Sequence, residues 1–130
     1  MRKYGVSAIN AIQHYHSGRS SSIVDAWEQA VADVFPDSRS SQLKGCPRGT
    51  FLGLCENGTV VGVPSGRYTK SQKNKLYGLR ALELLYETPE LADDKAALWR
   101  AVMGDQEKKP NHQMDVVVSL WKAGLIFTRR

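Results

Sequence analysis

The sequence predicts an α+β fold, mainly helical, with about five helices and one central β-hairpin near residues 50–63. Apolar residues recur at helical spacing in several stretches, each bounded by a capping residue or a stop signal. Asn57-Gly58 stands between two runs rich in Val, Leu, Phe and Thr, which is the strongest short-range signal for a hairpin. The 130 residues, 42% apolar and 24% charged, fit one globular domain, so a single domain over residues 1–130 is expected.

Two helices are predicted before the hairpin. The first has a stripe of apolar residues at helical spacing and ends at Gly18; the stripe consists of Ala8, Ile9, Ile12 and Tyr15. The second opens with a capping box from Ser22 to Asp25 and ends at Pro36. Its apolar face consists of Ile23, Trp27, Ala30, Val31 and Val34. Residues 37–49 are predicted to form a polar loop.

The hairpin is predicted to pair strands near residues 50–56 and 59–63 through a type I′ turn at Asn57-Gly58. In that register Gly53 lies opposite Gly62, which leaves a notch that another group can approach closely. The alternation assigns one face of the ribbon to the core: Leu52, Leu54, Val61 and Val63.

Three further helices are predicted after the hairpin. Thr69 and Gln72 form a capping box for a helix that extends to about Tyr86 and carries a wide leucine stripe. Thr88-Pro89 ends it and precedes a helix that stops at Gly104. The last helix is capped by Asn111 and closed by Gly124, and residues 125–127 form an apolar tail that packs onto the core or a neighbouring subunit.

The chain has a net charge of +5 and an isoelectric point near 9.4. Its charged residues are unevenly distributed along the sequence. Residues 39–80 contain eight lysines and arginines against Glu56 alone, and an acidic block follows at residues 83–94. Opposite patches on one small protein suit anionic partners or copies of the protein itself.

Two basic segments are candidate anion sites. Arg67, Tyr68, Lys70 and Lys73 lie at a helix start, where free amides favour an anion although the cations oppose the helix dipole. Lys44, Cys46 and Arg48 lie in the glycine-flanked loop before the first strand, whose amides can converge on a phosphate or carboxylate. The alternative readings, a solvated basic face and a simple chain turn, remain open.

His112 and Asp115, three residues apart at the start of the last helix, can share a face and bind a substrate. Helix capping explains the same residues. A small enzyme would need Cys46 and His112 to meet in one pocket. No catalytic residue, metal site or cofactor is predicted, because no known metal or nucleophile motif is present.

Three strings carry a resemblance to a known family: KGCPRGTFLGLCE, GRYT with NKLYGLRALELL, and NHQMDVVVSLWKAGLI. They resemble an uncharacterised bacterial family with the motifs KGCPRGxFLGLCE and NHQMDVV. The chain is also similar to small proteins on mobile bacterial gene cassettes. The resemblance implies a self-contained, often oligomeric module and carries over no catalytic residue.

The expected function is therefore a non-enzymatic module that self-associates and binds an anionic small molecule or a protein partner. Nucleic-acid binding is one alternative, favoured by the basic segment, and the small enzyme is the other. No apolar run approaches the roughly 18 residues of a membrane span, so no membrane partner is expected. The N-terminus leads into no signal-like apolar block, so a cytoplasmic location is expected. Two cysteines are too few for a disulfide framework, so reduced thiols are expected.

Overall fold

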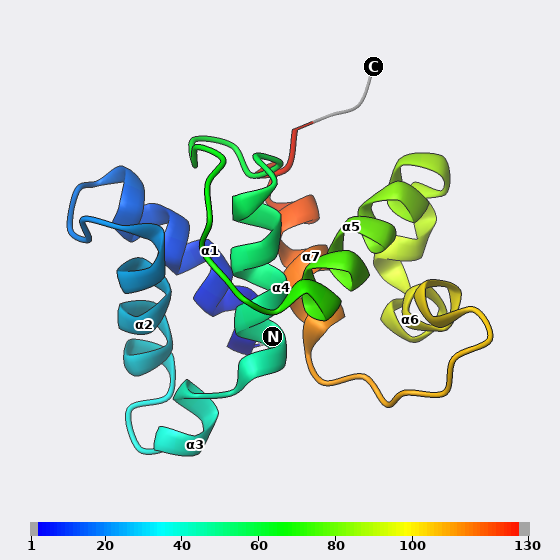
Figure 1. The fold of residues 1–130 in the computed structure, drawn as a ribbon, viewed down its shortest axis with the longest axis horizontal. Helices are drawn as coiled ribbons and strands as arrows, with labels where there is room; N and C mark the ends of the chain where they lie inside the picture. The colour runs from blue at the N-terminus through cyan, green and yellow to red at the C-terminus, as the bar shows by residue number, and fades with distance from the viewer. Residues whose placement is uncertain (1–2, 128–130) are drawn as a thin grey trace.

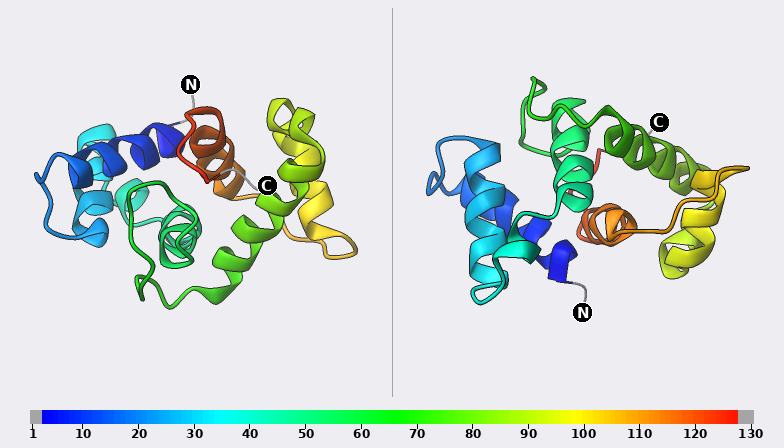
Figure 2. Two further views of the ribbon diagram at one scale, coloured as in Figure 1. Left: turned by 90° about the horizontal axis from the view of Figure 1, so that it is seen from above. Right: turned by 60° about the horizontal axis from the view of Figure 1, so that its bottom comes forward.

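The computed structural model describes residues 3–127 and shows an all-helical chain over that range. The elements in order are α1 (Lys3–His16), α2 (Ile23–Val34), α3 (Arg39–Gln42), α4 (Gly45–Glu56), α5 (Gln72–Glu87), the 3₁₀ turn η1 (Pro89–Asp93), α6 (Lys95–Met103) and α7 (Gln113–Lys122). Helices α4 and α7 lie at the centre, with α1 and α2 on one side and α5 and α6 on the other (Figures 1 and 2).

The predicted β-hairpin is wrong, and so is the α+β class. Residues 45–56 form α4 instead of a loop and a strand, and no strand forms within residues 3–127. A short apolar run flanked by glycines fits a buried helix as well as a strand, because burial on all sides removes the periodicity that separates the two. Phe51, Leu52, Leu54 and Cys55 are all fully buried, as expected for a helix surrounded by others.

Asn57-Gly58 ends α4 rather than turning a hairpin. Gly58 has a φ of +76°, its N–H donates to the carbonyl of Cys55, and the N–H of Thr59 donates to that of Leu54. These two bonds form the Schellman motif that closes many helices. A type I′ turn and a Schellman motif both require positive φ, so the dipeptide alone does not distinguish them.

The second predicted strand is also absent, but its residues pair with the end of the chain. Val60 and Ile126 form an isolated antiparallel bridge, flanked by a 2.8 Å bond from the N–H of Val61 to the carbonyl of Leu125. Ile126 is buried, whereas Phe127 is half-exposed. The apolar tail therefore packs onto the core through Ile126.

Glycines at every fourth position explain how α4 packs. Gly45, Gly49 and Gly53 lie on one helix face, and α5 lies directly against two of them. A Cβ on Gly49 would lie 2.8 Å from the Cβ of Ser71, and one on Gly53 would lie 2.7 Å from the Cα of Lys75. The close neighbour expected at Gly53 is thus α5, and Gly62 lies elsewhere, against His16.

The other helices were predicted with small errors at their starts. Ser22 caps α2 by accepting from the N–H of Asp25, and Gly18, Gly104 and Gly124 follow their helices with positive φ. Helix α5 begins after Ser71 rather than Thr69, and α7 begins after His112 rather than Asn111. The predicted 37–49 loop contains the short helix α3 and the first turn of α4.

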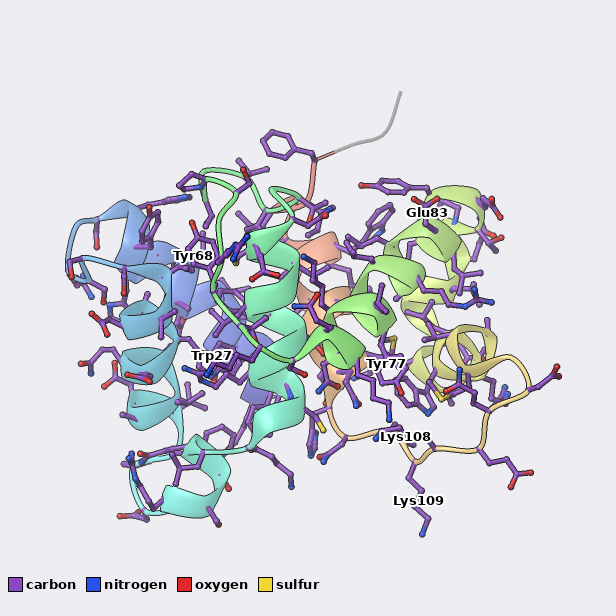
Figure 3. All side chains as sticks on the ribbon, viewed as in Figure 1. Trp27, Tyr68, Tyr77, Glu83, Lys108 and Lys109 are labelled. Atoms are coloured by element: carbon purple, nitrogen blue, oxygen red, sulfur yellow. The ribbon has the colours of Figure 1, made fainter. Side chains whose placement is uncertain are left out.

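Aromatic pairs join neighbouring helices of the fold. The rings of Trp27 on α2 and Phe51 on α4 stack with centroids 4.9 Å apart. Tyr77 on α5 meets Trp99 on α6 edge-on at 5.5 Å. Figure 3 shows Trp27 directed from α2 toward α4, and Tyr77 on the α6 side of α5. The first contact holds α2 against the central helix α4, and the second joins α5 to α6.

Gly53→Ala should destabilise the protein by roughly 1–3 kcal/mol, the usual cost of overpacking a well-packed contact. The new methyl would lie 2.5 Å from the Cβ of Lys75 and 2.7 Å from its Cα, so the two helices must separate. Urea unfolding measures the effect. Gly45→Ala on the same helix is the control: nothing lies within 4 Å, and stability should change by less than about 1 kcal/mol. Equal effects of the two substitutions would contradict the close α4–α5 contact.

Candidate functional site

An open groove of about 1140 Å³ lies where the segment between α4 and α5 runs back along α4. Figure 1 shows this segment crossing α4 before α5 begins. The groove is lined from both ends of α4, from the start of α5 and from the connecting segment: Gly45, Arg48, Gly49, Glu56, Asn57, Gly66, Arg67, Tyr68, Thr69, Lys70, Ser71, Gln72 and Lys75. The two basic segments singled out in the sequence therefore meet in one place.

Glu56, at the end of α4, holds the connecting segment in place. Its carboxylate accepts bonds from the N–H groups of Tyr68 and Thr69, at 2.8 and 3.3 Å, and from the Nζ of Lys75 at 2.8 Å. The backbone carbonyl of Glu56 also accepts from the N–H of Gly66. A single half-buried residue thus ties the connecting segment to both helices.

These bonds favour the charged form of the Glu56 carboxyl. The hydrogen bond from Lys75 is the largest cause, followed by the bond from Tyr68, and together they outweigh burial and lower the pKa from 4.5 to about 2. Glu56 and Lys75 neutralise one another, so the one carboxylate among the described lining residues adds no net negative charge.

Three cations remain at the groove. Arg67 and Lys70 are exposed and form no ion pair with any residue of the described range. Arg48 is 3.5 Å from Glu28, an exposed pair that contributes little. The N-cap residues of α4 and α5, Lys44 and Ser71, make no side-chain capping bond. First-turn amides that lack a side-chain cap attract anions.

A part-buried chain of polar side chains lies beneath Ser71. The Nδ2 of Asn74 donates to the Oγ of Ser71, and the Oδ1 of Asn74 accepts from the Nε2 of Gln113 at 3.3 Å. The Oε1 of Gln113, which is fully buried, accepts from the N–H of Asn111. The chain links the start of α5 to the start of α7, so the groove rests on three helices.

The structure brings together four of the predicted site residues: Arg48, Arg67, Tyr68 and Lys70. Lys44 lies at the N-cap of α4 outside the lining, and Cys46 is half-buried in its first turn. Lys73 lines a different groove, between α5 and α6. Sequence reasoning missed the role of Glu56, although its position as the one acid within a basic stretch was a usable signal.

His112 and Asp115 lie together at a second, smaller cavity of about 270 Å³, with Lys95, Trp99 and Met114. The Nδ1 of His112 is 3.0 Å from one oxygen of Asp115, and the Nζ of Lys95 is 2.6 Å from the other. Burial raises the pKa of Asp115, but these two bonds outweigh it, so the pKa lies below its usual value. His112 has a φ of +68° and provides no side-chain cap.

Cys46 and His112 do not form a pair. Within the described range His112 bonds to Asp115 and packs on the ring of Tyr4, whose centroid is 4.8 Å away, and Cys46 lies outside that cavity. The buried Cys55 has a pKa raised far above its usual value by loss of solvent. No group of three His, Cys, Asp or Glu side chains within residues 3–127 is arranged to hold a metal ion.

Residues 1–127 match the model of a family of unknown function, DUF6979. The chain belongs to the DUF6979 family. The expectation of an uncharacterised family is thereby confirmed. No curated protein and no solved structure gives a significant match. The family match covers both grooves and all the predicted site residues, but it assigns none of them a role. No helix among the described residues of this DUF6979 chain has the length and apolar character needed to cross a membrane.

The stability of this DUF6979 chain should fall in acid because of Glu56. A pKa lower in the folded than in the unfolded chain means that the carboxylate stabilises the fold above pH 4.5, and this contribution is lost progressively toward pH 2. Glu56→Gln should cost about 2 kcal/mol at neutral pH, the size of a hydrogen bond to a charged group. It should also flatten the pH dependence in that window.

Urea unfolding between pH 2 and pH 7 measures both effects. Asp93→Asn is the control, because Asp93 forms an exposed pair with Lys122 and should change stability by less than about 1 kcal/mol. A Glu56→Gln variant with the wild-type pH profile would contradict the stabilising role of the Glu56 carboxylate.

Proposed function

We propose that the protein is a non-enzymatic module that binds a phosphate-bearing small molecule in the groove between α4 and α5. One observation carries the proposal: Arg48, Arg67 and Lys70 converge with two helix N-termini that lack side-chain caps. Arginine donors and free amides are the groups that recognise phosphate most strongly.

The charge balance of the lining supports an anion rather than a cation. Glu56 is the one carboxylate among the lining residues, and its oxygens are already occupied by Lys75 and the amides of residues 68 and 69. A cation would therefore meet no available carboxylate there, whereas an anion would meet cations and amide donors.

The occupied side chains also support binding rather than catalysis. The hydroxyl of Tyr68 donates to the carbonyl of Pro64 at 2.6 Å, and the pKa of Tyr68 is raised, chiefly by burial. General acid–base catalysis requires a group near neutral pKa that can reach the substrate. Neither Tyr68 nor Glu56 meets that requirement.

The concave shape favours a small ligand over a nucleic-acid duplex. A volume of about 1140 Å³ is slightly above the roughly 300–1,000 Å³ of ordinary ligand sites. Nucleic-acid binding, suggested by the basic segment, is tested as a separate arm of the experiment below. The same proposal includes a cytoplasmic location, a bacterial origin on a gene cassette and self-association. The composition and the sequence resemblance support these three points.

Calorimetric titration should detect inorganic pyrophosphate binding to the wild-type protein, and Arg67→Ala/Lys70→Ala should weaken it by roughly tenfold or more, because charge-assisted bonds are lost. Lys108→Ala/Lys109→Ala is the matched control. It removes the same charge from the loop before α7 (Figure 3). Neither lysine lines the groove, so the affinity should stay within about twofold at 0.15 M salt.

A single-stranded oligonucleotide provides the second arm. Binding that is much tighter than that of pyrophosphate and that falls steeply with salt would favour the nucleic-acid alternative. Equal losses in the groove variant and the loop variant would overturn the groove as the site, since net charge alone would then explain the binding.

A further inference from the structure

A second groove, of about 540 Å³, lies between the first half of α5 and the end of α6. It shares no lining residue with the groove of the proposed phosphate site, so it does not depend on that proposal. Its volume is within the roughly 300–1,000 Å³ of ordinary small-molecule sites. The residues that line it form an apolar floor with charged side chains at its edges.

The floor of this second groove is apolar. Tyr77 of α5 and Val102 and Met103 of α6 line it, and all three are buried. Leu76 lines the groove beside them with 62% of its surface accessible, which makes it one of the most exposed large apolar side chains of the described range. An apolar group bound here would remove Leu76 and the floor from water together, which is favourable.

Contacts behind the floor hold its shape. The ring of Tyr77 meets that of Trp99 edge-on at 5.5 Å, and the Nε1 of Trp99 donates to the carbonyl of Lys108 at 2.8 Å. At the end of α6, the N–H of Gln106 donates to the carbonyl of Met103 at 3.0 Å. A ligand would therefore meet a groove that is already formed, which lowers the entropic cost of binding.

The hydroxyl of Tyr77 is a donor that the described part of the chain leaves unused. Tyr77 is only 7% exposed, yet its hydroxyl forms no hydrogen bond with another described residue, and the oxygen is not closed off from solvent. Buried tyrosines usually find a hydrogen-bond partner for this group. Tyr77 lies on the α6 side of α5 (Figure 3) and lines the groove, so its hydroxyl is available to an oxygen of a bound molecule.

Two cations border the groove from α5. Lys73 and Arg80 lie three residues before and four residues after Leu76, so the three side chains share one face of the helix. Both cations are exposed and form no ion pair or hydrogen bond with any residue of the described range. Lys73 also lies in the first turn of α5, where a cation opposes the helix dipole. An anionic group at this edge would be attracted by both cations and would offset that unfavourable placement.

Asp105 makes the two edges of the groove different. It lies in the turn after α6, whereas both cations lie on α5, and it forms no ion pair with any described residue. Its carboxylate repels an anion, so the anionic end of a ligand is directed to the α5 edge. The lining therefore orients a molecule that has one charged end and one apolar end.

We propose that this groove binds an organic carboxylate with an apolar body, of the acyl or aromatic acid class. The carboxylate binds at Arg80 and Lys73, and the apolar body covers Leu76 and the floor. The guanidinium fork of arginine matches the two oxygens of a carboxylate. Lys73, Arg80 and Asp105 give the lining a net charge of +1, from two cations and one anion, which a singly charged head group balances.

Octanoate is a simple probe of this class, and acetate and octan-1-ol represent its head group and its tail alone. A titration followed by ¹⁵N–¹H NMR should show shifts concentrated at residues 73–80 and 102–106. Acetate and octan-1-ol should each bind at least about fivefold more weakly, because neither contacts both the cations and the apolar floor. Inorganic pyrophosphate should not displace octanoate, since the two grooves share no lining residue.

Variants at the two edges should change octanoate binding in opposite directions. Lys73→Gln/Arg80→Gln should weaken it roughly tenfold or more, because the charge-assisted bonds are lost. Asp105→Asn should tighten it about twofold, because a repulsive charge is removed. Lys108→Gln/Lys109→Gln, an equal loss of charge outside the lining, is the control and should stay within about twofold. The NMR spectrum of each variant reports whether it is folded.

Four outcomes would overturn the proposal. The first is an absence of octanoate shifts up to its solubility limit, or shifts scattered over the surface. The second is equal binding of octan-1-ol and octanoate, which would show that the cations play no part. The third is displacement of octanoate by pyrophosphate, which would place both in one site. The fourth is an equal loss in the groove and loop variants, which net charge alone would explain.

Discussion

The close contact between α4 and α5 is the constraint on which the rest of the structure depends. Two glycines, Gly49 and Gly53, remove the side chains that would separate the helices, so Ser71 and Lys75 lie directly on the α4 backbone. This position brings the Nζ of Lys75 to Glu56, and Glu56 in turn fixes the segment that precedes α5. The groove forms because the α4–α5 contact places Lys75 beside Glu56, and Glu56 then holds the connecting segment along α4.

The same contact also decides the electrostatics of the groove. A basic stretch of the chain would repel itself if its cations were brought together without compensation. The pairing of Glu56 with Lys75 removes one positive and one negative charge from the lining. Of the other lining cations, Arg67 and Lys70 form no ion pair within the described residues, and Arg48 has only the weak pair with Glu28. The structural role of Glu56 and the proposed anion binding are therefore two consequences of one ion pair.

Helix α5 serves separate purposes on its different sides. Its first turn contributes to the groove, its inner face fills the core, and its outer face is exposed. Lys73 illustrates the division: it lies among the basic residues in the sequence, but the helical rotation places it away from Lys70 and Ser71 and beside Leu76. Charge density along a chain does not reveal such a division, because neighbours in sequence point in different directions on a helix.

The sequence by itself determined most of the helices, because capping residues and stop glycines act locally: Ser22, Gly18, Gly104 and Gly124 were all read correctly. Four residues that the sequence singled out line the groove: Arg48, Arg67 and Lys70, chosen for their charge, and Tyr68, chosen because it lies between two of them. Only the tertiary structure decided that residues 45–56 are helical and that Glu56 binds Lys75, nineteen residues away. Both depend on the burial of α4 among its neighbours. Full burial hides the helical periodicity of residues 45–56. The glycines on α4 allow a close contact only when α5 lies against them.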